Sequence, residues 1–573
     1  MRRRGFNILM LLIVLGGIVP LAGGAAGAAP TGYVVVYKAG ATLAQARAAV
    51  ATAGGTLVSE NKAVGVATVV SNRSDFVSRV MRQPALYGAT RNRPFAATKA
   101  FTESEWLRIE KLTPAERRDG AARSGSAPAR STESSESGDP LASLQWGNEM
   151  VHATSDGSYA VQQGDSRVLV GVIDTGIDGS HPDLAPNLDV SLSRNFTTDI
   201  PEDPLGNPLD GPCEVPSCKD PADVDDGGHG THVSGIIASA LNGLGTSGVA
   251  PKVTLVNLRA GQDSGFFFLQ ETVDAMTYGA DIGVDVFNMS YFTDPWLYNC
   301  LDHPDDSAEE QAQQKTIREA TQRAADYAFK RNVTLVSAEG NEATDTGNPT
   351  LDETSPDYPL GTEKSRVVDN SCIDVPTESN HVLSISALGP SGNKSDFSSY
   401  GVEQTTVSAP GGWFRDFFGT PQNRVPENMI LSTYPEHVAL EEGGIDENGN
   451  VLSPFFVKDC DGDVCGYYQY LQGTSMASPY ATGVAALIVS QYGNKDGQHK
   501  GGLTMNPVQV EKILIRTAQE HACPDPRTVS YVNVGRPASW DATCVGDAEF
   551  NGFYGHGIVD ALAAVSGGRG EGN

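Results

Sequence analysis

The sequence is short of positive charge: its 573 residues hold 41 Lys and Arg against 70 Asp and Glu, a formal net charge of −29. This acidity argues against nucleic acid as the main partner, because polyanions repel one another. The 63 glycines follow no G-X-Y period, which excludes a collagen-like chain. Beyond the first 30 residues, no stretch is long and apolar enough for a bilayer, which needs roughly 20 residues.

Positive charge is enriched at the front of the chain. Residues 1–138 hold 18 Lys and Arg and 9 Asp and Glu, whereas residues 139–573 hold 23 and 61. The net charges are therefore +9 and −38. A basic front section and an acidic body indicate segments with different fates. Hydrophobic residues form 39% of the whole, enough for a sizeable core.

The first residues have the features of a secretory signal. Arginines at 2–4 precede an apolar run at 8–21 and the small residues Ala26-Gly27-Ala28. A membrane anchor is the alternative, but about 14 apolar residues do not comfortably span a bilayer. We therefore predict a signal peptide at 1–28 and a secreted, extracellular protein with no stable membrane anchor after cleavage.

Eight cysteines, all in the acidic body, fit an oxidising destination. The close pairs 213/218 and 460/465 suggest local bridges, and 300/372 and 523/544 are then the preferred remaining pairs. Eight cysteines allow 105 connectivities, so this pairing is a preference. A zinc site is the alternative, although there is no CxxC or matching His pair near either C-x₄-C.

Residues 29–96 read as a small, self-contained module. Apolar, β-branched runs at 33–37 and 64–70 predict strands, and helical spacing at 41–53 and 75–81 predicts helices. This alternation fits a ferredoxin-like sandwich. Residues 97–138 are rich in Ser, Ala, Glu and Arg, which predicts a cleavable linker unable to bury enough apolar surface to order itself.

The acidic body carries residues suited to nucleophilic catalysis. An apolar run at 167–173 predicts a central parallel strand that ends at Asp174, where open α/β sheets place their sites. His229 lies at a helix start within DGGHGTH, and Ser475 precedes a buried helix within GTSMASP. Asn341 follows a short strand at 333–336. His232 is interpreted as structural, because the zinc-protease pattern H-E-x-x-H is missing.

These four residues supply every part of a serine-based mechanism. A serine hydroxyl needs a base such as imidazole, a carboxylate orients that imidazole, and fixed donors stabilise the oxyanion. The order along the chain is Asp174, His229, Asn341, Ser475. A lipase-like site would need G-x-S-x-G and the order Ser, Asp, His, so that alternative fails.

At these residues the chain resembles the subtilisin-like (S8) serine proteases. The matching motifs are VIDTGIDGSHPDL at 172–184, HGTHVSGIIA at 229–238 and GTSMASPYATGVAAL at 473–487. The resemblance covers most of 139–567 and implies an α/β catalytic domain whose mostly parallel sheet is flanked by helices. It implies Asp174 as orienting carboxylate, His229 as general base and acid, Ser475 as nucleophile and Asn341 as oxyanion donor.

Residues 29–96 resemble the family's inhibitor (I9-like) propeptide, which assists folding and blocks the cleft until autocleavage. The charge pattern agrees independently, because a +9 section can dock on a −38 partner. We therefore predict a self-processing preproenzyme, a secreted serine endopeptidase acting on proteins or peptides, monomeric, with a short tail at 568–573. A catalytically inactive binding scaffold is the alternative.

Departures from the family concern the substrate site. Ser290, Tyr291 and Phe292 stand where the family has Ser-Leu-Gly, and with Gly340 they are the candidate substrate-binding residues. Phe292 in place of glycine is expected to reshape the S1 side of the cleft. Long insertions at about 199–226, 295–322, 344–372 and 413–467 favour restricted specificity over a broad scavenger.

The predicted chemistry needs no cofactor, although structural calcium is compatible with the sequence. Asp183 matches a calcium-ligand position of some relatives, but the companion loop at 241–249 looks shorter than theirs. The acidic loop 459–465 alternates carboxylates around a glycine, which suits either Ca²⁺ or a solvated turn.

Overall fold

The structure is a computed structural model that describes residues 31–92, 109–124 and 139–567, apart from residues 204, 205, 207, 360 and 498. The predicted signal peptide at 1–28 and the tail at 568–573 lie outside these ranges. In the described ranges no helix is long and apolar enough to cross a membrane.

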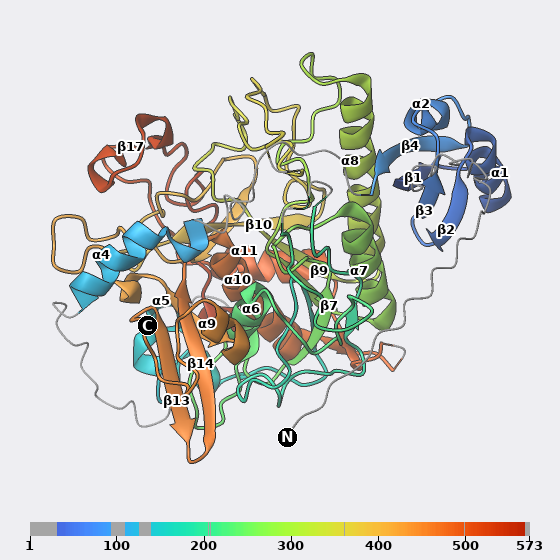
Figure 1. The fold of residues 1–573 in the computed structure, drawn as a ribbon. Coiled ribbons are helices and arrows are strands. Elements are labelled where there is room, and N and C mark those ends of the chain that lie inside the picture. The colour runs from blue at the N-terminus through green and yellow to red at the C-terminus, as the bar shows by residue number, and fades with distance from the viewer. Residues whose placement is uncertain are drawn as a thin grey trace, which may run out of the picture.

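Residues 31–92 form a separate α+β domain at the right of Figure 1. Strands β1 (Thr31–Tyr37), β2 (Thr56–Asn61), β3 (Val66–Ser71) and β4 (Leu86–Arg91) make an antiparallel sheet in the order β2-β3-β1-β4, with helices α1 (Leu43–Ala53) and α2 (Phe76–Val80). The predicted ferredoxin-like order is confirmed, and β2 and β4 are additions. A capping box between Thr42 and Gln45 begins α1, and Gly54 at φ 94° ends it.

Successive side chains of β1 point alternately into two different hydrophobic cores. Tyr33 and Val35 pack in the domain's own core with α1 and α2, whereas Val34 and Val36 pack in a core of the acidic body. The second face rests on α7 (Leu269–Ile282) and α8 (Ala308–Phe329), as Figure 1 shows. Arg323 Nη1 of α8 donates to the carbonyl of Tyr37 at 2.7 Å.

Residues 109–124, inside the predicted linker, are ordered on the acidic body. Helix α4 (Pro114–Ser124) begins where Thr113 and Glu116 cap each other, with proline at the first position. Leu112 is buried in the main core, and Lys111 pairs with Glu442 at 2.6 Å. Residues 109–124 of the predicted linker are therefore ordered, because the surface that they bury belongs to the body.

The body is built on a parallel sheet of seven strands in the order β11-β10-β9-β8-β5-β7-β6. The strands are β5 (Leu169–Ile173), β6 (Arg194–Asn195), β7 (Thr254–Arg259), β8 (Val286–Met289), β9 (Thr334–Ala338), β10 (Val382–Leu388) and β11 (Thr405–Pro410). The five central strands are buried on both faces, which explains why apolar residues predominate in them.

Helices cover both faces of this sheet. Helices α6 (His229–Ala238), α10 (Thr474–Tyr492), α11 (Pro507–Thr517) and α12 (Ala561–Val565) share a core with Val170 and Val172 of β5. Helices α7 and α8 share a second core with Leu169 and Ile173 of the same strand. The two cores confirm the predicted layered α/β architecture.

The remaining elements decorate this frame. They are helices α5 (Trp146–Met150) and α9 (Glu436–Glu441), the antiparallel sheet of β12 (Ile430–Tyr434), β13 (Phe456–Asp461) and β14 (Val464–Leu471), the strand pairs β15 (Asn494–Lys495) with β16 (Leu503–Thr504) and β17 (Thr528–Val529) with β18 (Ala542–Thr543), and the 3₁₀ turns η1 (Ala142–Leu144), η2 (Ser158–Ala160), η3 (Pro426–Asn428), η4 (Val532–Val534) and η5 (Ala538–Trp540).

All eight cysteines are paired, as preferred from the sequence. The disulfides join Cys213 to Cys218, Cys300 to Cys372, Cys460 to Cys465 and Cys523 to Cys544. No free cysteine remains, so the zinc alternative is wrong.

Candidate active site

The carboxylate at the end of β5 contacts the histidine at the start of α6. His229 Nδ1 lies 2.7 Å from Asp174 Oδ1, and both side chains are buried. Gly230 permits this approach, because a Cβ at that position would lie 2.1 Å from the carbonyl oxygen of Gly176. The glycine in H-G-T-H therefore has a steric reason, and the predicted pair is brought together.

The loop before His229 is fixed by a second carboxylate. Asp225 Oδ1 accepts from the N–H groups of Gly227 and Gly228 at 3.2 and 3.0 Å, and its Oδ2 accepts from Thr231 N at 2.9 Å. His232 lies on the same helix, with Nε2 at 3.0 Å from the carbonyl of Gln469. Burial lowers the pKa of His232 to about 3, so its structural interpretation is supported.

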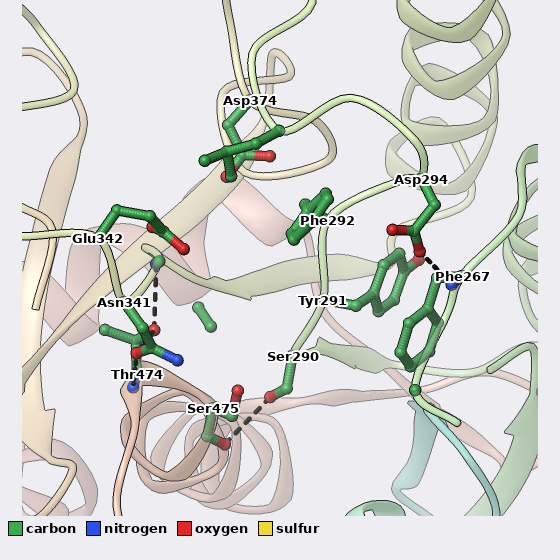
Figure 2. Close-up of a pocket in the computed structure, with 14 residues that line it drawn as sticks. Phe267, Ser290, Tyr291, Phe292, Asp294, Asn341, Glu342, Asp374, Thr474 and Ser475 are labelled. Atoms are coloured by element: carbon green, nitrogen blue, oxygen red, sulfur yellow. Dashed lines mark hydrogen bonds between the residues drawn. The ribbon is translucent and has the colours of Figure 1, made fainter. Parts of the chain in front are cut away.

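Asn341, just after β9, contacts the residue before Ser475 at the start of α10. Asn341 Oδ1 accepts from Thr474 N at 2.9 Å and from Thr474 Oγ1 at 3.0 Å, which leaves the amide nitrogen directed elsewhere. The carbonyl of Ser475 accepts from Ser290 Oγ at 3.1 Å. Asn341 and Ser475 line one pocket, as Figure 2 shows.

A residue that the sequence analysis missed occupies the space between base and amide. Glu110, fully buried, places Oε2 at 3.3 Å from His229 Nε2, and its Oε1 accepts from Asn341 Nδ2 at 3.3 Å. The backbone N–H of Gln472 donates to the Glu110 carbonyl at 3.3 Å. One carboxylate thus contacts both groups that a reacting carbonyl would need.

This carboxylate changes the electrostatics of the histidine. Burial alone lowers the pKa of His229, but the negative charges of Asp174 and Glu110 outweigh it and raise the pKa to about 10. His229 is therefore protonated near neutral pH while Glu110 is in place. An imidazolium has no lone pair on Nε2 and cannot accept a proton from serine.

The candidate substrate-binding residues line a single pocket that reaches Ser475. Ser290, Tyr291, Phe292 and Gly340 are all part of its wall (Figure 2). Three acidic residues that were not predicted, Asp294, Glu342 and Asp374, line it as well. They carry no motif: Asp294 and Glu342 lie just before the insertions at 295–322 and 344–372, and Asp374 lies just after the second.

Both carboxylate oxygens of Asp183 already accept hydrogen bonds from the protein. Its Oδ2 accepts from Thr246 N at 3.1 Å and Tyr468 Oη at 2.9 Å, and its Oδ1 accepts from Asn242 at 3.3 Å. Burial raises the pKa of Asp183 to about 7. The loop 459–465 is the β13–β14 turn, bridged by its disulfide. Calcium binding at either place stays a prediction.

Four other carboxyl groups in the described ranges lie near enough to share a cation. Asp199, Glu214, Asp220 and Asp263 offer oxygen atoms within 4.8 Å of one another. The buried guanidinium of Arg259 lies among them, 2.7 Å from Asp220 Oδ2 and 2.8 Å from Asp263 Oδ1. Arg259 therefore already supplies one positive charge to this cluster.

Comparison with known sequences finds relatives of the acidic body. The subtilase family model matches residues 165–557. The nisin leader peptide-processing serine protease of Lactococcus lactis subsp. lactis is 28% identical over 380 residues, 66% of this chain and 46% of that protein. Subtilisin DY of Bacillus licheniformis is 27% identical over 329 residues, 57% of this chain and 78% of that protein. The chain spans less than half the length of the nisin protease.

Solved structures share the fold at low identity. The epidermin leader peptide processing serine protease from Staphylococcus aureus superposes with a TM-score of 0.58 at 21% identity, covering 95% of this chain and 100% of that one. Fervidolysin from Fervidobacterium pennivorans has a TM-score of 0.53 at 20% identity, with 95% and 62% covered. These likenesses confirm the predicted subtilisin-like α/β fold. With the family model matched over most of its length, the chain belongs to the subtilase (S8) family of serine proteases.

Proposed function

We propose that this protein is an exported serine endopeptidase that works through an acyl-enzyme on Ser475 and is made as a self-processing precursor. One observation carries the proposal: a single buried carboxylate, Glu110, contacts both His229 Nε2 and Asn341 Nδ2 beside the serine. The base and the amide donor therefore face one small space that a scissile carbonyl would fit. Protein or peptide substrates, a monomeric state and an extracellular location belong to the same proposal.

In this mechanism each residue has one task. Asp174 holds the ring of His229 through Nδ1 and stabilises its imidazolium form. His229 Nε2 takes the proton of the Ser475 hydroxyl as the serine attacks. The Asn341 amide and the N–H groups at the start of α10 receive the negative charge on the carbonyl oxygen, helped by the positive end of the helix dipole.

The precursor would be inactive for two reasons. The domain at 31–92 is docked on α7 and α8, as expected of an inhibitor propeptide. Residues 109–112 also occupy the cleft, where Glu110 presents a negative charge to the donors intended for the oxyanion and keeps His229 protonated. Cleavage between 92 and 139 and departure of this segment would restore a neutral base.

The inactive-scaffold alternative is not favoured by any observation, because all four catalytic positions are filled. Labelling with a fluorophosphonate decides between the two. We expect the processed protein to be labelled on Ser475, located by mass spectrometry, with casein hydrolysis lost in proportion to the label. Protein denatured beforehand should stay unlabelled. Neither label nor hydrolysis in the folded, processed protein would support the scaffold instead.

Docking of the front domain can be tested at Gly88. This residue of β4 faces α8, and a Cβ there would lie 2.5 Å from Thr316 Oγ1. We expect Gly88→Val to lower the rate at which precursor becomes mature enzyme by about fivefold or more, as for the loss of roughly 1 kcal/mol of interface energy. Pulse-chase labelling measures that rate. Thr56→Val, on exposed β2 of the same domain, is the control; equal rates for the two variants would refute the docking role.

A further inference from the structure

The pocket that reaches Ser475 has an acidic interior. Figure 2 shows the carboxyl groups of Asp374 and Glu342 directed into the same space above Ser475, with the ring of Phe292 beside Asp374. Asp294 belongs to the lining too, but its Oδ2 accepts from Phe267 N, and it hydrogen-bonds with Asp357. Asp294 is thus used inside the protein, whereas Asp374 and Glu342 face the pocket, where Glu342 Oε2 also accepts from Ser399 Oγ at 3.3 Å.

Asp374 has an unsatisfied oxygen. Its side chain is buried, and its Oδ1 has no hydrogen-bond partner. No Lys or Arg of the described ranges forms an ion pair with it. Burial, followed by the nearby charges of Glu378 and Glu342, raises the pKa of Asp374 well above its usual range. A buried carboxyl group in this condition is costly without a cation or donor supplied from outside.

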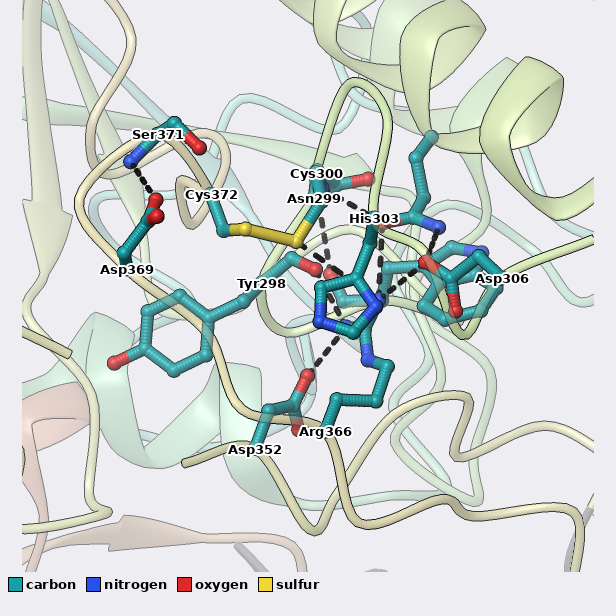
Figure 3. Close-up of a disulfide and its surroundings, with 12 residues drawn as sticks. Tyr298, Asn299, Cys300, His303, Asp306, Asp352, Arg366, Asp369, Ser371 and Cys372 are labelled. Atoms are coloured by element: carbon teal, nitrogen blue, oxygen red, sulfur yellow. Dashed lines mark hydrogen bonds and ion pairs between the residues drawn. A yellow bond between two sulfur atoms is a disulfide. The ribbon is translucent and has the colours of Figure 1, made fainter. Parts of the chain in front are cut away.

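The loop that presents Asp374 is rigidly held. The Cys300–Cys372 disulfide ends two residues before it (Figure 3). Ile373 exchanges backbone hydrogen bonds with Asn299 at 2.8 and 3.1 Å. Behind the disulfide, Arg366 pairs with Asp306 at 2.8 Å and with Asp352 at 2.5 Å, all three fully buried. The insertions at 295–322 and 344–372 are therefore joined at this point.

The same loop is tied to the substrate-binding segment. Thr293 N donates to the carbonyl of Val375 at 2.8 Å, directly beside Asp374. The Asp374 N–H donates to Glu378 Oε2 at 2.6 Å and fixes the following turn. A carboxyl group on a rigid support, with its free oxygen toward a pocket, has the organisation of a built recognition site.

The two carboxyl groups in this pocket favour a positively charged substrate side chain. We infer that Asp374 and Glu342 make this pocket a receptor for a basic P1 side chain, so that the protein cleaves after Arg or Lys. A guanidinium would give the Asp374 carboxylate the charge-assisted partner that the protein lacks, and its planar face could stack on Phe292. Phe292 then lines a cation pocket instead of simply crowding it. The inference rests on the proposed peptidase function and names its substrate class.

The test compares substrates that differ only at P1. Peptide p-nitroanilides with Arg, Lys, citrulline, norleucine, Phe or Glu at P1 are hydrolysed by the processed protein, with active sites counted by fluorophosphonate labelling. We expect kcat/KM for Arg to exceed that for its neutral isostere citrulline, and Lys to exceed norleucine, by at least about 100-fold. Phosphonates with Arg-like and norleucine side chains should show the same order in their inactivation rates.

Variants assign the preference to residues. Asp374→Asn should lower kcat/KM for Arg at least about 30-fold and leave norleucine within about threefold, and Glu342→Gln should lower it about tenfold. Asp369→Asn, exposed in the same insertion, is the matched control and should change neither. If Asp374→Asn does not fold, the wild-type profile and Glu342→Gln decide alone.

The outcomes separate this inference from the proposed function. Labelled enzyme that hydrolyses norleucine or Phe substrates as fast as Arg would overturn the basic P1 site while the peptidase stands. An Arg preference that persists in both variants would overturn the assignment to Asp374 and Glu342. Absence of both label and hydrolysis would refute the peptidase itself, and the basic P1 site with it.

Discussion

Ser475→Ala should reduce peptide hydrolysis by on the order of 10⁶-fold, since residues that act as one catalytic unit lose nearly all of their effect together. It should also leave the full-length precursor uncut if maturation is intramolecular. The physical reason is that the acyl-enzyme cannot form without the hydroxyl, although Asp174, His229 and Asn341 remain in place. The measurements are kcat/KM on a peptide substrate and the size of the accumulated chain.

Two controls make that result specific. Ser490→Ala lies on the same helix, where its hydroxyl donates to the Ala486 carbonyl at 2.7 Å, and should keep wild-type hydrolysis. Adding a trace of wild-type enzyme to the Ser475→Ala precursor tells whether the cut can occur in trans. Unchanged casein hydrolysis by pure Ser475→Ala protein would exclude this serine as the nucleophile.

Glu110→Gln should activate the uncleaved precursor. The substitution keeps the size of the side chain but removes the charge that helps to hold His229 protonated, and it weakens two charge-assisted contacts worth about 1.5–3 kcal/mol. We expect the full-length chain to be labelled by fluorophosphonate about 10- to 100-fold faster than the wild-type precursor. The label is followed at the molecular mass of the uncut chain during the first minutes.

The matched control is Arg118→Gln. Arg118 is exposed on α4 of the same segment, so its loss should leave the labelling rate unchanged. If the precursors of wild type and Glu110→Gln are labelled at the same rate, then Glu110 does not restrain the site. Slower labelling of the Glu110→Gln precursor would also show that Glu110 does not restrain the site.

The positions of the candidate catalytic residues could be predicted because each lies at a point that the backbone dictates. Asp174 follows a strand that is buried on both faces, and Asn341 follows another strand of the same parallel sheet, so both must reach the same edge. His229 and Ser475 begin helices that pack against each other. Local periodicity and strand direction are sufficient for such an argument, and the family motifs strengthened it.

The segment at 109–124 could not be predicted by the same means. Its composition is poor in apolar residues, so no signal within the segment indicates order. What orders it is a surface contributed by distant residues, including Glu442, Arg415 at 2.5 Å from Glu116 and Arg424 at 3.1 Å from Asp119. No pattern within the segment reports on partners some 300 residues away.

The acidic pocket escaped prediction for a related reason. Asp374 gains its role from a disulfide and a buried ion-pair network that join two insertions, and neither has a repeat or motif that fixes its place. The cysteine pairing was preferred from spacing, but its position under the pocket needs the three-dimensional path of both loops.

The front section contacts the body through two parts, the domain at 31–92 and the segment at 109–124. A single cut of the chain affects these two parts differently. A break between residues 92 and 109 severs the domain on α7 and α8 from the rest, yet residues 109–124 stay covalently joined to the body through their own C-terminal side. That segment then competes for the cleft at a high effective concentration, as any tethered ligand does. If the proposed maturation holds, we expect activation in two events, with a lag between the appearance of the cut chain and the appearance of activity.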